Sequence, residues 1–184
     1  MLDRLIYRLK QFWFALSSKM TEEDRLFAHQ HLNIKEAALF FSLPIYEQKH
    51  GVVVAEKMLA FAAHAGRTAG HKNIDKRKLV RLGLLHDIGK SAAKLSILDK
   101  GILVIIHKLI PPLYDQLAGW GNNERSPKWL RRYYVHKHHG TIGAEILSRI
   151  AEEKDIIDEV RSHDYPNTSH DLYMKILDKA DSTY

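Results

Sequence analysis

Residues 82–90 of the chain read LGLLHDIGK, an apolar run followed by a histidine, an aspartate and a lysine. The apolar residues continue a helical pattern that starts near Asp75, and we expect Gly89 to end that helix. Neighbouring side chains on a helix point about 100° apart, so His86 and Asp87 reach one cavity only where the helix breaks. Lys90 follows the break, where it can meet a phosphate. The stretch therefore predicts a site in which His86 and Asp87 hold metal beside a phosphate-binding lysine.

Three other predicted helices also carry a metal-binding side chain on an apolar face. The four side chains share helical faces as follows: His50 with Val54, Met58 and Phe61, His86 with Leu79 and Leu82, His163 with Ile156 and Val160, and Asp181 with Tyr173 and Leu177. One such histidine is more often an ordinary core residue. Four together, with a carboxylate among them, favour a metal site, because an unpaired carboxylate is costly to bury.

Composition restricts the chemistry of this site. The 184 residues include no cysteine and twelve histidines. A disulfide framework, a thiolate zinc site and a cysteine nucleophile are thereby excluded, and any transition metal must use imidazole and carboxylate ligands. Absence of cysteine also fits a reducing compartment, so we expect a cytoplasmic protein. The net charge of +6 suits an anionic substrate, but the basic residues are scattered, so we expect no nucleic-acid partner.

The hydrophobic pattern predicts an all-α fold. Helices are expected at about 21–31, 33–44, 46–65, 75–87, 102–110, 141–154, 156–163 and 171–183. Pro111-Pro112 is expected to stop one helix, and residues 119–127 (GWGNNERSP) are expected to form a loop. We place an N-terminal helical extension at 1–44 and a helical bundle domain at 45–184. The longest apolar run, Ile102–Ile106, is too short to span a bilayer.

The first 18 residues form an amphipathic pattern of their own. Their apolar side chains recur at helical spacing: Leu2, Leu5, Ile6, Leu9, Phe12, Trp13 and Leu16. Packing on the domain or on a second copy of the chain, which would give a homodimer, is the favoured interpretation. Attachment to a membrane surface through Arg4, Arg8 and Lys10 is the alternative, and we do not expect it because three basic residues are few.

The order of these residues resembles the HD-domain superfamily of metal-dependent phosphohydrolases. The resemblance rests on His50, on His86-Asp87-Ile88-Gly89-Lys90 and on the distal Ala180-Asp181, and it extends over about residues 45–184. His139-Gly140-Thr141-Ile142-Gly143-Ala144 and Val160-Arg161-Ser162-His163 are similar to elements of members that hold a second metal, such as the HD-type diadenosine tetraphosphate hydrolases. The resemblance implies an HD-domain helical bundle.

The resemblance also implies a ligand set. His50, His86, Asp87 and Asp181 would hold one ion, and His139 and His163 a second, with Asp87 bridging. His139 is chosen over His136 and His138 by its spacing to Gly143-Ala144, and Asp178 is a rival to Asp181. The sequence after His163 lacks a glycine-tyrosine-proline signature, which argues against a cyclic di-GMP phosphodiesterase.

Such a site would activate water between two cations and cleave a phosphoester or phosphoanhydride, with Asp87 and Lys90 as catalytic residues. Imidazole-rich ligation favours iron, manganese, zinc or cobalt over magnesium. The expected substrate is a small phosphate ester, in particular a nucleotide. The alternative function is a metal-bound HD regulatory or ligand-binding module with little turnover. The segment between Ser91 and His138 is expected to line the mouth of the pocket.

Overall fold

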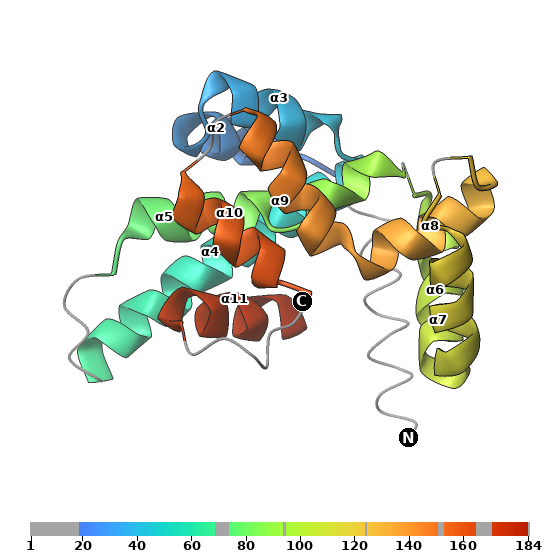
Figure 1. The fold of residues 1–184 in the computed structure, drawn as a ribbon. Coiled ribbons are helices and arrows are strands. Elements are labelled where there is room, and N and C mark those ends of the chain that lie inside the picture. The colour runs from blue at the N-terminus through green and yellow to red at the C-terminus, as the bar shows by residue number, and fades with distance from the viewer. Residues whose placement is uncertain are drawn as a thin grey trace.

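The structure is a computed structural model, and it describes residues 19–68, 74–93, 95–123, 125–150, 153–164 and 171–183. These residues form ten α-helices and a short 3-10 helix and contain no strand, which confirms the predicted all-α fold (Figure 1). In chain order the elements are α2 (Glu22–His31), α3 (Ile34–Ser42), α4 (Ile45–Thr68), α5 (Lys76–Leu85), η1 (Ile88–Ala92), α6 (Ile97–Leu109), α7 (Pro111–Trp120), α8 (Lys128–Lys137), α9 (His139–Arg149), α10 (Lys154–Ser162) and α11 (Leu172–Ser182). Within these ranges no helix is both long and apolar enough to cross a membrane. The amphipathic pattern of residues 1–18 lies outside the described residues.

The two helices at the centre of the fold, α4 and α5, approach each other unusually closely. A Cβ atom on Gly83 of α5 would lie 2.6 Å from the Cα of Ala55 in α4, so only glycine fits at this crossing. Val54, Met58 and Leu82 are fully buried beside it. The close crossing sets His50 of α4 next to His86 at the end of α5, with ring centroids 5.3 Å apart.

The main hydrophobic core joins the helices on both sides of this pair. Ala28 of α2 and Phe40 of α3 are buried in the same cluster as Leu147 of α9, Val160 of α10 and Leu177 of α11. Figure 1 shows α2 and α3 above α4 and α5, α11 below them, and the pair α9 and α10 crossing in front. The boundary at residues 44 and 45 stays a prediction, and the described part of the extension packs into the core of the domain.

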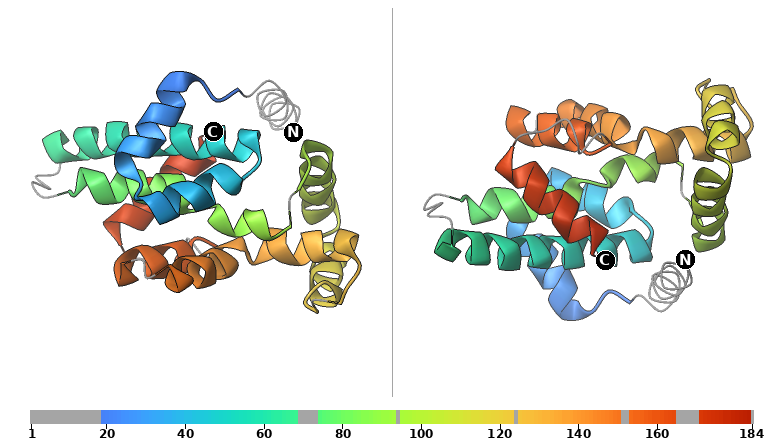
Figure 2. Two further views of the ribbon diagram at one scale, coloured as in Figure 1. Left: turned by 90° about the horizontal axis from the view of Figure 1, so that it is seen from above. Right: turned by 90° about the horizontal axis from the view of Figure 1, so that it is seen from below.

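A second, smaller core lies in the arm, which we define as α6, α7 and α8. Its buried residues are Leu95, Leu103, Tyr114, Leu117, Ala118 and Tyr133. The views in Figure 2 show the arm standing at one end of the molecule, apart from the main bundle. α8 leads from the arm directly into α9, so the arm is connected to the bundle at the first residue of α9, His139.

The structure corrects several predicted boundaries. The helix expected to reach Asp87 ends at Leu85, and Gly89 lies inside η1. Pro111 does end α6, but it also starts α7, where proline suits the first turn because its missing N–H would have no partner. The helices α7 and α8 were not predicted, because their apolar faces serve only the small arm core. The expected loop is shorter, since Gly119 and Trp120 belong to α7.

Candidate metal centre

The six residues that the sequence predicts as metal ligands come from six different parts of the fold and meet at one place. His50 lies in α4, His86 caps the end of α5 and Asp87 precedes η1, while His139 begins α9, His163 follows α10 and Asp181 lies near the end of α11. We call these six residues the ligand cluster. Three subsets of it each place ligand atoms within 4.8 Å of one another: His50 with His86 and Asp87, His86 with His163 and Asp181, and Asp87 with His139 and His163.

Asp87 lies at the middle of the cluster. Its Oδ2 is 3.4 Å from Nε2 of His50 and 3.3 Å from Nε2 of His86. Its Oδ1 is 3.1 Å from Nε2 of His139 and 3.9 Å from Nε2 of His163. Asp181 joins from the side, with Oδ1 3.0 Å from Nε2 of His50. One carboxylate thus presents a different oxygen to each of two histidine pairs, which is the arrangement that a bridging ligand requires.

Backbone carbonyl groups fix the rings of two of these histidines. Nδ1 of His86 donates to the carbonyl oxygen of Gly83 at 2.8 Å, and Nδ1 of His139 donates to that of His136 at 2.9 Å. A proton held at Nδ1 leaves Nε2 with its lone pair, and in both rings Nε2 faces Asp87. This is the tautomer and orientation that a metal-binding imidazole adopts when its second nitrogen is hydrogen-bonded.

Polar atoms without partners indicate that the cluster fits a cation. Nε2 of His86 and Oδ1 of Asp87 are fully buried and have no hydrogen-bond partner. Burial alone would raise the pKa of Asp87, but His86 and Lys90 hold it well below its ordinary value, so the carboxylate is charged. Burial lowers the pKa of His163 to about 3, so that ring is neutral. A charged carboxylate beside the neutral ring of His163 belongs to the kind of donor set that transition-metal sites use.

Glycine contacts bring α9 to the cluster. A Cβ atom on Gly89 would overlap the carbonyl oxygen of His139 and would lie 2.7 Å from the backbone nitrogen of Gly143. Gly143 in turn has the backbone nitrogen of Gly89 3.1 Å from its own Cβ position. The glycine of the HDIGK run is therefore required for the close contact between η1 and α9 that places His139 against Asp87.

Asp164 belongs to the surroundings of the site, and sequence analysis did not select it. Its Oδ2 accepts hydrogen bonds from the backbone N–H groups of Gly140 and Thr141, at 2.9 and 3.3 Å, in the first turn of α9. Its Oδ1 lies 3.1 Å from Nδ1 of His139, and its side chain is 4% exposed. Asp164 thus connects the end of α10 to the start of α9, beside both His139 and His163. Its position directly after His163 was the only signal in the sequence.

Lys90 occupies a different position from the one predicted. Its ammonium group pairs with Oδ2 of Asp87 and lies 3.6 Å from Oε2 of Glu47. Glu47 is 1% exposed and also pairs with Lys100 of α6 at 2.9 Å. Burial alone would lower the pKa of Lys90, but the two carboxylates raise it, so the lysine stays charged. Glu47, one turn before His50, is a second site residue that the sequence analysis missed.

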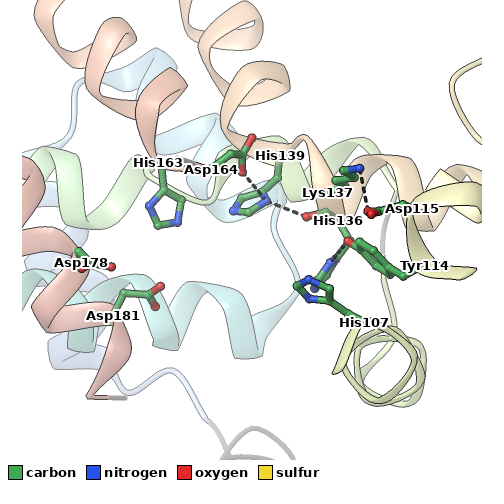
Figure 3. Close-up of a pocket in the computed structure, with 10 residues that line it drawn as sticks. All are labelled: His107, Tyr114, Asp115, His136, Lys137, His139, His163, Asp164, Asp178 and Asp181. Atoms are coloured by element: carbon green, nitrogen blue, oxygen red, sulfur yellow. Dashed lines mark hydrogen bonds and ion pairs between the residues drawn. The ribbon is translucent and has the colours of Figure 1, made fainter. Parts of the chain in front are cut away.

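A cavity of about 380 Å³ opens beside the cluster (Figure 3). His139, His163 and Asp181 line it on the bundle side. The arm supplies the other wall: His107, Tyr114, Asp115, His136 and Lys137. This observation agrees with the expectation that the segment 91–138 lines the pocket. Lys90 is not among the lining residues.

The rival residues lie outside the cluster. The ring of His138 packs on Tyr134, with centroids 4.8 Å apart. Nδ1 of His136 and Oη of Tyr114 share a hydrogen bond of 2.6 Å. Asp178 lines the cavity but belongs to none of the groups that could hold an ion. The geometry therefore brings His139 to Asp87 and Asp181 to His50, rather than these rivals.

Comparison with known proteins gives one positive result. The family model described as the HD domain matches residues 54–184, which is most of the chain and includes every member of the ligand cluster except His50. No curated protein and no solved structure gave a significant match.

Proposed function

The chain belongs to the HD-domain family, whose members are generally metal-dependent phosphohydrolases, and from this premise we propose that it hydrolyses a small phosphate ester at the ligand cluster. The observation that carries the proposal is the pair of buried, unpartnered atoms at the centre, Nε2 of His86 and Oδ1 of Asp87. In a folded protein such atoms normally have a partner, and bound cations would supply one for each of them.

We infer that the cluster holds two ions. His50, His86, Asp87 and Asp181 would hold the first, and Asp87, His139 and His163 the second. The two oxygens of Asp87 support this division, because each faces a different pair of histidines. Iron, manganese, zinc or cobalt suits such imidazole-rich sites, whereas magnesium prefers oxygen ligands.

The chemistry follows from what the residues can do. Metal held by these residues would supply an activated water molecule and would neutralise charge on the phosphoryl group. Asp87 contributes a fixed negative charge at the centre of the site, and carbonyl groups hold the rings of His86 and His139 in position. Lys90, which also lies 3.6 Å from Oε2 of Glu47, pairs with Oδ2 of Asp87. Preorganised groups of this kind avoid reorganisation during the reaction.

The wall formed by the arm supports a nucleotide as the substrate. The ring of His107 is exposed and stacks on Tyr114, with centroids 4.5 Å apart and an angle of 28°. A planar base can extend such a stack while its phosphate reaches the cluster across the cavity. Burial lowers the pKa of His136 to about 3, so this neighbouring ring is neutral and offers a hydrogen-bonding group without charge.

The test combines metal analysis with a substrate panel. The purified protein would be analysed for metal, then assayed with nucleotides, dinucleoside polyphosphates and a simple aryl phosphate, with chelator or with added manganese. We expect about two transition-metal ions per chain and turnover that chelator abolishes. His139→Ala should lose activity while the matched variant His138→Ala retains it. A chain that binds a single ion away from His139 and His163 would contradict the dinuclear assignment.

One observation favours the second candidate, a metal-bound regulatory or ligand-binding module with little turnover. The basic side chain expected to meet phosphate, Lys90, is held by Asp87 and Glu47 and does not line the cavity. Such a module would bind metal and a nucleotide with the same residues. It is distinguished by calorimetry that shows nucleotide binding with no turnover on the whole panel.

A further inference from the structure

Helix α6 carries an apolar face that no described element covers. Four of its side chains lie on one line at steps of four, three and four residues, which we call the α6 stripe: Leu98, Ile102, Ile105 and Leu109, exposed by 69, 53, 57 and 75%. The opposite side of the helix packs Leu103 into the core of the arm. An amphipathic helix normally has one apolar face, which it buries. Helix α6 has two apolar faces, one around Leu103 in the core of the arm and one formed by the exposed stripe.

A continuous exposed stripe of this kind is typical of a docking surface. Isolated apolar residues on a surface are ordinary, but a contiguous row of large aliphatic side chains is rarely left in water. The exposed Ile110 (51%) lengthens the stripe at the end of the helix. The stripe therefore requires an occupant with an apolar face of similar length.

The start of the described chain lies close to the start of the stripe. Asp24, in the first turn of α2, pairs with Lys49 of α4 at 2.7 Å. Less than one turn earlier in α4, Glu47 pairs with Lys100 in the first turn of α6 at 2.9 Å. The first turns of α2 and α6 thus lie against the same end of α4. The described chain therefore begins, at Lys19, near the end of α4 that contacts the first turn of α6.

We propose that residues 1–18 of the same chain dock their apolar side chains on the α6 stripe. These residues lie outside the described part of the structure, and the proposal rests on their sequence and on where they are attached. Their apolar positions recur at helical spacing from Leu2 to Leu16. A helix of 18 residues is about 27 Å long, and the stripe from Leu98 to Leu109 extends over about 16 Å, so the segment is long enough to cover it.

Attachment next to the stripe favours this occupant over a second copy of the chain. A segment joined by a short connection has an effective concentration in the millimolar range, far above that of a second copy at micromolar protein. Charge also argues against a membrane as the occupant. The segment has three basic residues, Arg4, Arg8 and Lys10, each contributing about 1 kcal/mol to binding an anionic membrane.

Docking would also affect the cavity. The helix that carries the stripe carries His107, which lines the cavity wall. A segment bound along the outer side of α6 would hold that wall in place. The proposal is independent of the metal chemistry, so it can fail while the proposed function stands.

The sequence contains no cysteine, so two introduced cysteines are the only residues that can form a disulfide in a cross-linking experiment. In the full-length chain, Leu9→Cys would be combined in turn with Ile102→Cys, Ile105→Cys or Leu109→Cys, and disulfide formation would be followed under mild oxidation. We expect at least one of these pairs to form an intramolecular disulfide in a monomer. The matched control is Leu9→Cys with Ile34→Cys, because Ile34 is 90% exposed but lies on α3. Disulfides found only between two chains, or in none of the pairs, would overturn the proposal.

A second measurement needs no new covalent bond. If the segment is docked, trypsin should cleave at Arg4, Arg8 and Lys10 only after the segment is released. Ile105→Lys should accelerate this cleavage about tenfold, which corresponds to a loss of about 1.4 kcal/mol of docking free energy. Ile34→Lys should leave it unchanged. Equal rates in both variants, or protection that appears only with phosphatidylserine vesicles, would overturn the proposal.

Discussion

The ligand cluster and the arm differ in how far their charged side chains are exposed. In the cluster, four imidazole rings surround Asp87, whose side chain is 3% exposed. In the arm, the paired side chains of Lys137 and Asp115 are 37% and 59% exposed. The backbone differs in the same way. In the bundle, Gly83 and Gly89 allow contacts that no larger residue permits, but Gly119 of the arm has no atom within 4 Å of its Cβ position. The bundle is therefore tightly constrained next to the ligands. In the arm a comparable contact occurs where α7 ends, because a Cβ atom on Gly121 would overlap the carbonyl oxygen of Leu130, whereas the surroundings of Gly119 are open.

This difference matches two parts of the proposed function, metal binding in the bundle and substrate recognition at the wall that the arm forms. Metal ligands must be held in fixed positions by packing and hydrogen bonds, and the bundle provides both. The arm needs only a stable small core and a wall that faces the cavity. We therefore expect changes in the bundle to remove metal and activity, and changes in the arm to alter which substrate is accepted.

The largest effect is expected from Asp87→Asn. The change removes the charge between the histidine pairs and leaves neutral groups that hold cations weakly. Metal content should fall from about two ions per chain to none after dialysis, and turnover should fall below detection. Elemental analysis and the phosphoester assay measure the two results. Retention of both ions by the variant would contradict the bridging role, and His138→Ala serves as the control.

A pair of glycine substitutions compares the two regions directly. Gly89→Ala forces a Cβ against the backbone of His139, so it should lower the free energy of unfolding by about 3 kcal/mol, the upper end for overpacking. Gly119→Ala, in the last turn of α7 where an added Cβ atom meets nothing, should raise it by at most about 0.5–1 kcal/mol, because alanine favours a helix. Urea unfolding of both variants measures the effects. Similar changes in the two variants would remove the distinction between bundle and arm.

The bundle was also the part of the fold that the sequence predicted best. Helical periodicity placed His50 and His86 on buried faces, and both residues are buried. Spacing to Gly143-Ala144 selected His139, and the structure sets that residue rather than His138 against Asp87. The burial of His50 and His86 follows from the pattern because a buried helical face leaves regular apolar spacing, and the role of these residues and of His139 as ligands stays a prediction.

Other features left no such pattern. The helices α7 and α8 pack on a core of six buried residues, so their apolar periodicity is weak. Glu47 and Asp164 could not be selected, because a carboxylate in a sequence looks the same whether it faces solvent or a buried lysine. Lys90 was expected to meet a phosphate, and nothing in the sequence indicated that its ammonium group also lies 3.6 Å from the buried Glu47, a contact between residues 43 apart in the chain.

A smaller effect is expected from Asp164→Asn. The amide can still accept hydrogen bonds from α9, but it removes the negative charge beside Nδ1 of His139. Loss of such a partner typically weakens metal binding by about 10–100-fold. Calorimetric titration of metal-free protein should show this loss for one of two ions. Asp158→Asn, on the exposed side of α10, is the control. An equal loss for both ions would show that Asp164 acts on the whole fold and not on His139.

The smallest effect concerns pH and compares a buried ion pair of the bundle with the exposed pair of the arm. The carboxylate of Glu159 pairs with Lys78 at 2.8 Å and is 8% exposed, and burial raises its pKa from 4.5 to about 7. The folded state therefore binds this proton more tightly than the unfolded state, so the free energy of unfolding should fall as pH rises from 4.5 to 7 and then level off. Glu159→Gln should remove this part of the slope, on the order of 1 kcal/mol.

The control is Asp115 of the arm, whose pKa is lowered by the hydrogen bond from Lys137. Asp115→Asn should therefore leave the slope of the free energy of unfolding between pH 4.5 and 7 unchanged. Urea unfolding of the three proteins between pH 4.5 and 7 measures the slopes, and an unaltered slope in Glu159→Gln would show that this carboxylate is ionised throughout the range.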